Sequence, residues 1–389
     1  MIHILINNKR ALAYTTYVLN IQPIIGADNI ELLTVMGWSV IAQKGEFKVG
    51  DLCVYFEIDS KLPVAEWSEF MASKHYKVKT MKLSKFNVVS QGLALPLSVF
   101  NGQVPNQEGI DVTDILKVTY SVEEDNARKN GNPNAKYDSM KARHKKLFRK
   151  PWAKWLMKRA WGRKVMFFFF GKKKDNPRGF PTFISKTDEE RIENMPWRLT
   201  EGKEWLVTEK LDGTSCTYAL ERKGKNKFEY YVCSRNVRQA DRDQECYHKY
   251  NIYWALSDKY NIEEHLKGYL INNPDVKWVC IQGEGVGNVQ GNPLKLSEDD
   301  LYVFNFKDSV RGRISSLAGM DLVRDWGMKW VPVIGTVSLP GTMEEMKAQA
   351  TGYSLVNPNV LREGYVYRSL DGVESFKNVS NEYLMKMHS

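Results

Sequence analysis

The chain has 389 residues, of which 43% are hydrophobic and 12% aromatic, as in a globular protein of two or three domains rather than a disordered one. It has no apolar run of 18 residues, and its first ten residues are too short and too charged for a signal peptide, which argues against a membrane-spanning or secreted protein. Five cysteines without a C-x-x-C pair and six scattered histidines argue against a zinc site and favour the reducing cytoplasm.

The net charge of +10 comes from one segment. Residues 141–174 contain 14 Lys and Arg and no Asp or Glu, so the rest of the chain is slightly acidic. A positive segment on such a body predicts a polyanionic partner, with nucleic acid first and an anionic membrane surface second.

Residues 1–120 are predicted to form an all-β domain. Apolar and polar residues alternate, with turn residues between the runs, in three segments: 14–21, 30–36 and 39–43. Short strands at this spacing favour a small barrel, and the OB-fold is the small barrel most used on nucleic acid. A lysine-rich stretch near the end of the domain is either a nucleic-acid face or a solvated edge strand: Lys77, Lys79, Lys82 and Lys85.

Residues 121–180 interrupt this pattern as a linker and insertion. A polar, turn-rich piece suggests a flexible linker, and the basic segment after it interleaves aromatic residues with cations: Phe148, Trp152, Trp155, Trp161 and 167–170. Aromatic faces and lysines suit single strands or nicked ends of nucleic acid. The alternative is a basic amphipathic helix that lies on a membrane or on the protein itself.

Residues 181–389 are predicted to form a mixed α+β domain. Strand-like runs occur at 204–209, 215–220, 228–234, 276–284, 301–307, 330–336 and 363–368. Amphipathic, helix-like segments lie between them at 242–257, 263–271 and 314–326.

The segment EKLDG, Glu209 to Gly213, follows the apolar run 205–207. It holds Lys210 two residues before an Asp-Gly turn, where a lysine amine can be desolvated and directed at a phosphorus atom. The alternative is a solvated lysine beside an ordinary β-turn.

Further polar clusters follow, each next to a predicted strand: Ser234-Arg235-Asn236, Gln282-Gly283-Glu284-Gly285, the aromatic run Tyr302 to Phe306, Glu363 to Arg368, and Ser375-Phe376-Lys377. Taken singly, each is as easily a solvent-exposed strand end. The glycine-rich segment 283–292 matches neither a P-loop nor a dinucleotide-binding fingerprint, which argues against both kinds of nucleotide site.

In this order, the clusters resemble the motifs of the covalent nucleotidyltransferases, the superfamily of polynucleotide ligases and mRNA capping enzymes. The chain is most similar to ATP-dependent RNA ligases with an N-terminal OB domain. The likeness covers roughly 1–100 and 181–389 and includes the phrases FPTFISKTDEERIEN, IQGEGVGNVQGN, SFKNVSNEYL, GADNIELLTV, GEFKVGDLCVYFEIDS and SQGLALPL. It implies an N-terminal OB-like β-barrel followed by a mixed α+β nucleotidyltransferase domain.

The resemblance also implies roles for particular residues. Lys210 would be the adenylated nucleophile and Lys377 would contact the α-phosphate, with ATP and Mg²⁺ (or Mn²⁺) as cofactors and Glu363 as the metal ligand. Arg235 would contact the nucleotide and the phosphate end, Glu284 the ribose, and Phe304 or Phe306 the adenine. The other nucleotide-binding residues would be Glu209, Asp212, Gly213 and Lys186. The residues expected to bind nucleic acid are Lys77, Lys79, Lys82, Lys172 and Lys173.

One position departs from the family pattern. Many relatives have a second lysine two residues after Lys377, where this chain has Val379, and the next lysine is Lys386. A lysine amine attacks only when neutral, so the pKa of Lys210 is expected to fall through burial and through nearby cations such as Lys377.

The expected function is RNA repair by an ATP-dependent RNA ligase. It would seal 5′-phosphate and 3′-hydroxyl ends, with RNA on the 3′-hydroxyl side, through lysyl-AMP and an adenylated 5′ end. Only 12 residues follow Lys377, where capping enzymes and most DNA ligases have an OB domain. The alternatives are a non-catalytic nucleic-acid-binding protein with an inactive ligase-like core, or a DNA ligase. The expected partner is RNA or a nicked RNA-containing duplex. The protein is expected to be a monomer and to have no stable association with membranes.

Overall fold

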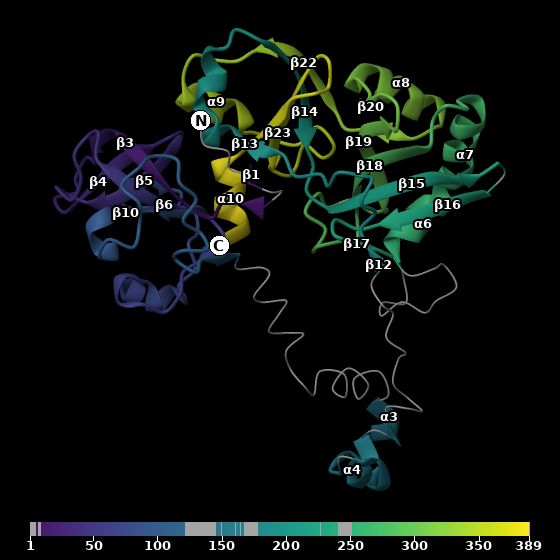
Figure 1. The fold of residues 1–389 in the computed structure, drawn as a ribbon, viewed down its shortest axis with the longest axis horizontal. Helices are drawn as coiled ribbons and strands as arrows, with labels where there is room; N and C mark the ends of the chain where they lie inside the picture. Colours follow the sequence, from purple (N-terminus) through teal and green to yellow (C-terminus); the bar gives the residue numbers. More distant parts are fainter. Residues whose placement is uncertain are drawn as a thin grey trace. The chain divides into compact units, whose positions relative to one another are not determined.

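The computed structural model of the chain describes residues 5–6, 9–120, 145–148, 150–159, 161–163, 165–166, 178–225, 227–239 and 251–388. They divide into two compact units (Figure 1). The first takes in 1–33, 40–79 and 91–176, and the second takes in 34–39, 80–90 and 177–389. The domain boundaries expected from the sequence, at 120 and 180, stay predictions. No helix in the described ranges is both long enough and apolar enough to cross a membrane.

The first unit is built on a five-stranded sheet. Its strands, in spatial order, are β10 (Leu93–Pro96), β6 (Leu52–Phe56), β3 (Ala13–Pro23), β4 (Ile30–Val35) and β5 (Trp38–Gln43). The burial along β5 alternates as a two-residue period requires, because successive side chains of a strand point to opposite faces. The three alternating runs predicted from the sequence are therefore confirmed as β3, β4 and β5.

Short elements complete this unit. They are β1 (Leu5–Ile6), β2 (Lys9–Arg10), β7 (Ser60–Lys61), β11 (Thr119–Tyr120) and the 3₁₀ helices η1 (Glu66–Lys74) and η2 (Leu97–Phe100). A buried apolar cluster that includes Val54, Phe56, Leu62 and Phe100 forms the core under the sheet. The described part of the basic segment contains the helices α3 (Lys145–Phe148) and α4 (Pro151–Met157), and its residues 161–163 and 165–166 are also helical.

The second unit contains two sheets. The larger has the spatial order β12 (Arg178–Gly179), β17 (Val237–Arg238), β16 (Lys227–Cys233), β15 (Thr214–Gly224), β18 (Trp278–Val286), β19 (Asp300–Asp308) and β20 (Gly312–Arg313), and β21 (Lys329–Trp330) pairs with β19. The smaller has the order β13 (Glu190–Arg191), β24 (Ser375–Val379), β23 (Gly364–Ser369), β14 (Glu204–Lys210) and β22 (Val333–Ser338). A hairpin of β8 (Met81–Leu83) and β9 (Val88–Ser90) also belongs to this unit.

Helices cover one face of the larger sheet (Figure 1): α6 (Ile252–Lys259), α7 (Ile262–Asn272) and α8 (Ser316–Asp325). The remaining helical elements are η3 (Ile192–Asn194), η4 (Pro196–Thr200), α9 (Met343–Ala350) and α10 (Asn381–His388). The predicted helices at 263–271 and 314–326 and the strand-like runs are confirmed, except that the run at 330–336 is split between β21 and β22. The prediction at 242–257 is confirmed from 252 onward, and its first part lies outside the described residues.

The two faces of the larger sheet differ in chemistry, because alternate residues of a strand face opposite sides. On β15, Cys216, Tyr218 and Leu220 enter the apolar core beneath the helices. Ser215 and Thr217 point to the other face, where their register partners on β18 are polar. This face therefore carries Glu284, one of the residues of the candidate site.

Candidate active site

The motif lysine meets its carboxylate through strand pairing. Lys210 is the last residue of β14, and Glu363 immediately precedes β23, which runs antiparallel to β14 with Lys210 opposite Gly364. The register places Lys210 Nζ 2.7 Å from Glu363 Oε1. Both side chains are largely covered, with 27% and 16% of their surface exposed.

The rest of the EKLDG motif turns toward the larger sheet. Gly213 has room for no side chain, because a Cβ there would lie 2.3 Å from the carbonyl oxygen of Gly285 on β18. The close approach of these two backbones brings Asp212 and Glu284 near Lys210, and their charges act on it. Asp212 also accepts a hydrogen bond from the hydroxyl of Tyr383 on α10.

The electrostatics of Lys210 differ from the expectation. Burial disfavours its charged form, but the charges of Glu363, Glu284 and Asp212 outweigh burial and raise the pKa of Lys210 above its ordinary value. The expected fall of this pKa is therefore wrong for the arrangement in this structure, because the nearest charges are carboxylates rather than cations. Lys377, the cation expected to lower it, lies beside Asp188 instead.

Burial also affects the pKa values of the carboxylates around Lys210. Burial raises the pKa of Glu284 to about 8, and the charges of Glu363 and Asp212 add to this shift, while Lys210 opposes it. Burial likewise raises the pKa of Glu363, although Lys210 partly compensates. Several negative groups are thus crowded around one lysine, an arrangement that favours binding of additional positive charge.

Three cations belong to this site: Lys186 and Arg235 lie on loops, and Lys377 lies on β24. Arg235 donates to Asp188 Oδ2 at 3.1 Å, and Lys377 Nζ lies 3.2 Å from Asp188 Oδ1, so one carboxylate bridges both. Lys186 donates to Asn236 Oδ1 at 3.0 Å, next to Arg235 in the chain. The structure therefore brings together all three cations that the sequence assigned to the nucleotide.

Asp188 was not predicted, although it lies within the phrase SKTDEER on which the family resemblance partly rests. Its role depends on contacts with two residues far along the chain. The same is true of Tyr383, which reaches Asp212 from the last helix. Neither contact has a sequence signal of its own.

Of the two aromatic candidates for adenine, only Phe304 is accessible. Phe306 is fully buried in the helix-side core, with its ring centroid 5.0 Å from Tyr269 and 5.5 Å from Trp326. Its predicted contact with adenine is therefore wrong. The ladder between β18 and β19 shifts register beside Phe304. Phe304 itself is half-buried, with the Arg368 guanidinium 5.8 Å from its ring centroid.

Glu209, the residue before Lys210, is 2% exposed. Its Oε2 accepts a hydrogen bond from the Leu355 backbone at 2.8 Å, and burial raises its pKa. Its Oε1 is buried and has no hydrogen-bond partner among the described residues. A buried acceptor of this kind can receive a donor from a ligand.

The donor set suits a divalent cation held partly by substrate. Glu363 Oε2 is buried and accepts no hydrogen bond from the residues that the structure describes. Among the same residues, no three ligand-type side chains converge into a complete metal site. Mg²⁺ is commonly held by one or two carboxylates together with substrate phosphates, so Glu363 fits as such a ligand.

The other predicted positions lie elsewhere. Val379 is 2% exposed and contributes no charge. Lys77 is half-buried, whereas Lys79 and Lys82 are exposed, and their contact with nucleic acid stays a prediction. The predicted nucleic-acid-binding residues Lys172 and Lys173 lie outside the described residues.

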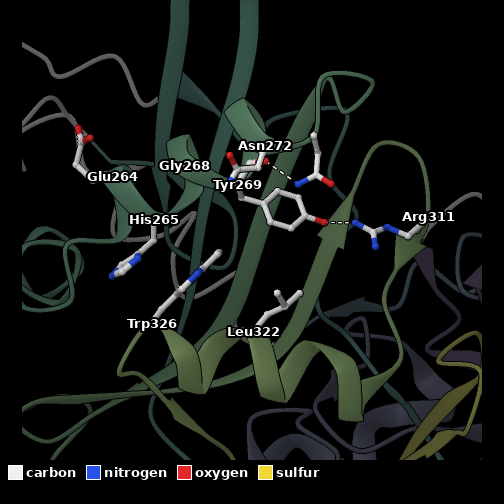
Figure 2. Close-up of a pocket in the computed structure, with 9 residues that line it drawn as sticks. Glu264, His265, Gly268, Tyr269, Asn272, Arg311, Leu322 and Trp326 are labelled. Atoms are coloured by element: carbon white, nitrogen blue, oxygen red, sulfur yellow. Dashed lines mark hydrogen bonds between the residues drawn. The ribbon is translucent and has the colours of Figure 1, made fainter.

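A pocket of about 470 Å³ opens between α7 and α8 and is separate from this site (Figure 2). Its Arg311 is already held by Asp308 and by the Tyr269 hydroxyl, and its His265 stacks on Trp326 at 5.2 Å. None of the motif residues lines it. The candidate active site is therefore the cluster around Lys210.

Comparison with known proteins gives two family matches. One, described as an OB-fold domain, covers residues 12–97, and the other, described as RNA ligase, covers residues 203–387. No curated protein matches the chain. The predicted N-terminal OB-fold domain is thereby confirmed.

Solved structures of Naegleria gruberi RNA ligase are similar over nearly their whole length. A lysine-to-alanine variant with ATP and manganese is 30% identical with a TM-score of 0.72, covering 96% of this chain and 98% of that one. The same ligase with pyrophosphate is 32% identical with a TM-score of 0.73, covering 98% and 99%. A glutamate-to-alanine variant with AMP and manganese is 30% identical with a TM-score of 0.72, covering 97% and 99%.

Proposed function

The chain belongs to the RNA ligase family and is an ATP-dependent RNA ligase, and on this basis we propose that it seals nicks or breaks with RNA on the 3′-hydroxyl side. The observation that supports the chemistry best is the 2.7 Å contact between Lys210 Nζ and Glu363 Oε1, with Asp212 and Glu284 close enough to act on the same amine. The protein acts as a monomer in the cytoplasm.

In the first step, Lys210 Nζ attacks the α-phosphorus of ATP. The neutral amine forms a nitrogen–phosphorus bond, the bond from phosphorus to the bridging oxygen of pyrophosphate breaks so that pyrophosphate leaves with its electron pair, and the nitrogen releases one proton to solvent. Phosphoryl-type transfer of this kind depends mainly on positioning and charge. Arg235, Lys377 and Lys186 supply positive charge for the phosphates.

In the structure, Asp188 already pairs with two of these cations and competes with the phosphates of ATP for them. It bridges Arg235 and Lys377 in the structure, so triphosphate oxygens compete with one carboxylate for two cations. The anionic substrate wins this competition because it carries more charge and more acceptor oxygens than Asp188. Asp188 thus keeps both side chains oriented toward the site.

Lys210 must lose its proton before it attacks. Glu363 would hold a divalent cation, whose positive charge would neutralise this carboxylate and the phosphates of ATP. With Glu363 occupied in this way, the largest charge that raises the pKa of Lys210 would be compensated, and burial would shift the balance toward the neutral amine. Asp212, held by Tyr383, keeps the turn after Lys210 in place.

The remaining steps use the same cations. AMP passes from Lys210 to the 5′-phosphate of RNA, with transfer of the phosphorus from nitrogen to oxygen. The 3′-hydroxyl then attacks the 5′-phosphorus, which forms the phosphodiester and releases AMP. Glu284 binds the ribose and Phe304 packs on the adenine, while Glu209 accepts a donor from the nucleotide.

The first experiment is incubation with labelled ATP and Mg²⁺. The wild-type chain is expected to form a protein–AMP adduct, and Lys210→Ala and Lys210→Arg to form none, because an arginine side chain stays protonated. Lys267→Ala, which changes an exposed helix lysine, is the matched control and should label normally. An adduct that survives Lys210→Ala would sink the assignment.

A second experiment separates the alternatives. Nicked duplexes are offered with RNA or DNA on either side of the nick. Sealing only where the 3′-hydroxyl strand is RNA supports the proposal, and equal sealing of all-DNA nicks identifies a DNA ligase. Salt-sensitive RNA binding without any adduct identifies a non-catalytic binding protein.

A further inference from the structure

The described part of the basic segment folds around its own small core. Ala153, Met157 and Met166 are buried at 0%, 8% and 2% exposure. Leu147, Phe148 and Leu156 pack partly buried against them. The aliphatic side chains of α4 therefore point inward, toward α3 and toward Met166 in the helical residues that follow.

The outward surface has a different composition. Trp152, Trp155 and Trp161 are 48%, 51% and 55% exposed. Lysines exposed beside them are Lys150, Lys154 and Lys158. Residues 141–174 contain no acidic side chain, so neighbours in the sequence cannot neutralise these cations. We call this surface, Trp152, Trp155 and Trp161 with the three lysines, the tryptophan face.

Two of the three tryptophans, Trp155 and Trp161, are in direct contact. The Arg159 guanidinium lies 3.5 Å from the centroid of the Trp155 ring, and the Trp161 ring meets Trp155 edge-on at 6.2 Å and 85°. Gly162 allows this approach, because a Cβ there would lie 2.2 Å from the Leu156 carbonyl oxygen. Ordered, exposed aromatic rings present binding area at a low cost in side-chain entropy.

We propose that the tryptophan face binds single-stranded RNA, with unpaired bases stacked on the tryptophans and phosphates contacted by the lysines. Aromatic rings among cations form the combination that binds single strands without sequence preference. Stacking needs bases whose faces are free, so single strands are favoured over intact duplex. This inference rests on RNA being the substrate of the proposed ligase, and it gives the enzyme a second RNA contact besides the catalytic site.

The composition of the face distinguishes RNA from a membrane. A helix that lies in a membrane interface turns a continuous aliphatic side toward the lipid. Here the leucine and methionine residues face the small core, and Val165, 41% exposed, is the one aliphatic exception among the large exposed hydrophobic residues of the described part of this segment. The exposed rings and ammonium groups match bases and phosphates more closely.

The test uses the full-length protein and a fluorescein-labelled polyuridine RNA, followed by fluorescence anisotropy. The variant Trp152→Ala, Trp155→Ala, Trp161→Ala is expected to bind this RNA about tenfold more weakly or worse, since each stacked base contributes about 1–3 kcal/mol. Trp197→Ala, which changes an exposed tryptophan of η4, is the matched control and should bind as the wild type does. Unchanged RNA affinity in the triple variant overturns the proposal.

A charge variant tests the other half of the face. Changing Lys150, Lys154 and Lys158 to Gln should lower the slope of log affinity against log salt by about 0.7 for each phosphate that the variant no longer neutralises. The tryptophan variant should leave this slope unchanged. A tryptophan variant that loses binding to phosphatidylserine vesicles but keeps its RNA affinity assigns the face to a membrane and also overturns the proposal.

Adduct formation with labelled ATP keeps the two proposals apart. The tryptophan variant should form the protein–AMP adduct at the wild-type level, because its changes lie outside the motif residues, and this also reports that the second unit is folded. If the wild-type chain forms no adduct but binds RNA through the tryptophan face, the ligase chemistry fails and the RNA surface stands.

Discussion

The cluster around Lys210 and the tryptophan face of α4 both use lysines, but in opposite surroundings. Around Lys210, charges of both signs are largely covered, and neighbouring charges shift the pKa of both Lys210 and Glu284. On the tryptophan face, every charged side chain is positive and is exposed to solvent. A buried charge needs its partner, whereas an exposed one is hydrated and acts almost independently. Changes in the first region should therefore cause large losses, and single changes in the second small ones.

The largest effect is expected from a buried pair elsewhere in the second unit. Lys347 of α9 donates to Glu193 Oε1 and to the Val379 carbonyl, both at 2.6 Å, and the two side chains are 14% and 1% exposed. Lys347→Met leaves Glu193 buried without this partner, which should lower the free energy of unfolding by about 3–5 kcal/mol. Urea unfolding of the variant measures this.

The matched control is the double variant Lys347→Met, Glu193→Gln, which should recover part of the loss because no charge stays unpaired.

The acid dependence of stability provides a second check on the same ion pair. Burial opposes ionisation of Glu193, but the charges of Lys347 and Arg191 outweigh it and hold its pKa below the ordinary value. The stability from this ionised carboxylate is present above the unfolded-state pKa of about 4.3 and is lost as the pH falls through the lower folded-state value. Unchanged stability of Lys347→Met would show that buried charges in this unit do not depend on their partners.

The next effect is on chemistry. Glu363→Gln removes the carboxylate that contacts Lys210 and that fits the divalent cation, and it should slow adduct formation by about 10²–10³-fold, the loss typical of one electrostatic group in an active site. Single-turnover labelling with ATP measures the rate. Glu374→Gln, which removes a carboxylate that pairs with Lys203 outside the motif residues, is the control and should keep the wild-type rate.

The effect of pH on the labelling rate of Glu363→Gln gives a further test of the same ion pair. In the free wild-type enzyme, the carboxylates raise the pKa of Lys210, so the labelling rate at ATP concentrations well below saturation, which reports on the free enzyme, should rise as the pH increases from neutral. Removal of the Glu363 charge lowers the pKa of Lys210, so the slower variant should reach its own maximal rate at a lower pH. A profile displaced to higher pH would contradict the ion pair.

The smallest effect is expected from the hydrogen bond between an uncharged hydroxyl and a carboxylate in the same site. Tyr383→Phe removes the hydroxyl that donates to Asp212 and leaves the ring in place. A hydrogen bond to a charged group contributes about 1.5–3 kcal/mol, so adduct formation should slow by roughly 10–100-fold without a change in the affinity for ATP. A binding measurement beside the labelling rate tests this, and weaker ATP binding at an unchanged labelling rate would assign Tyr383 to the nucleotide instead.

The architecture and the identity of most polar groups could be predicted from the amino-acid sequence. The alternation in 14–21, 30–36 and 39–43 predicted β3, β4 and β5, because a half-buried strand requires a two-residue period. The order of EKLDG, SRN, GEG, the aromatic strand, EGYVYR and SFKN indicated the family before any contact was known. Arg235 and Lys377 were assigned from these motifs, and Lys186 was assigned from the family resemblance.

Which groups act on one another depends on the tertiary structure. Sheet register places Glu363 against Lys210, and the resulting excess of carboxylates reverses the expected direction of the pKa of Lys210. The core beneath α7 and α8 buries Phe306 and leaves Phe304 accessible. The physical reason is common to both cases: a motif specifies which side chains a strand carries, whereas their partners depend on register, face and burial, which are set by segments far apart in the chain.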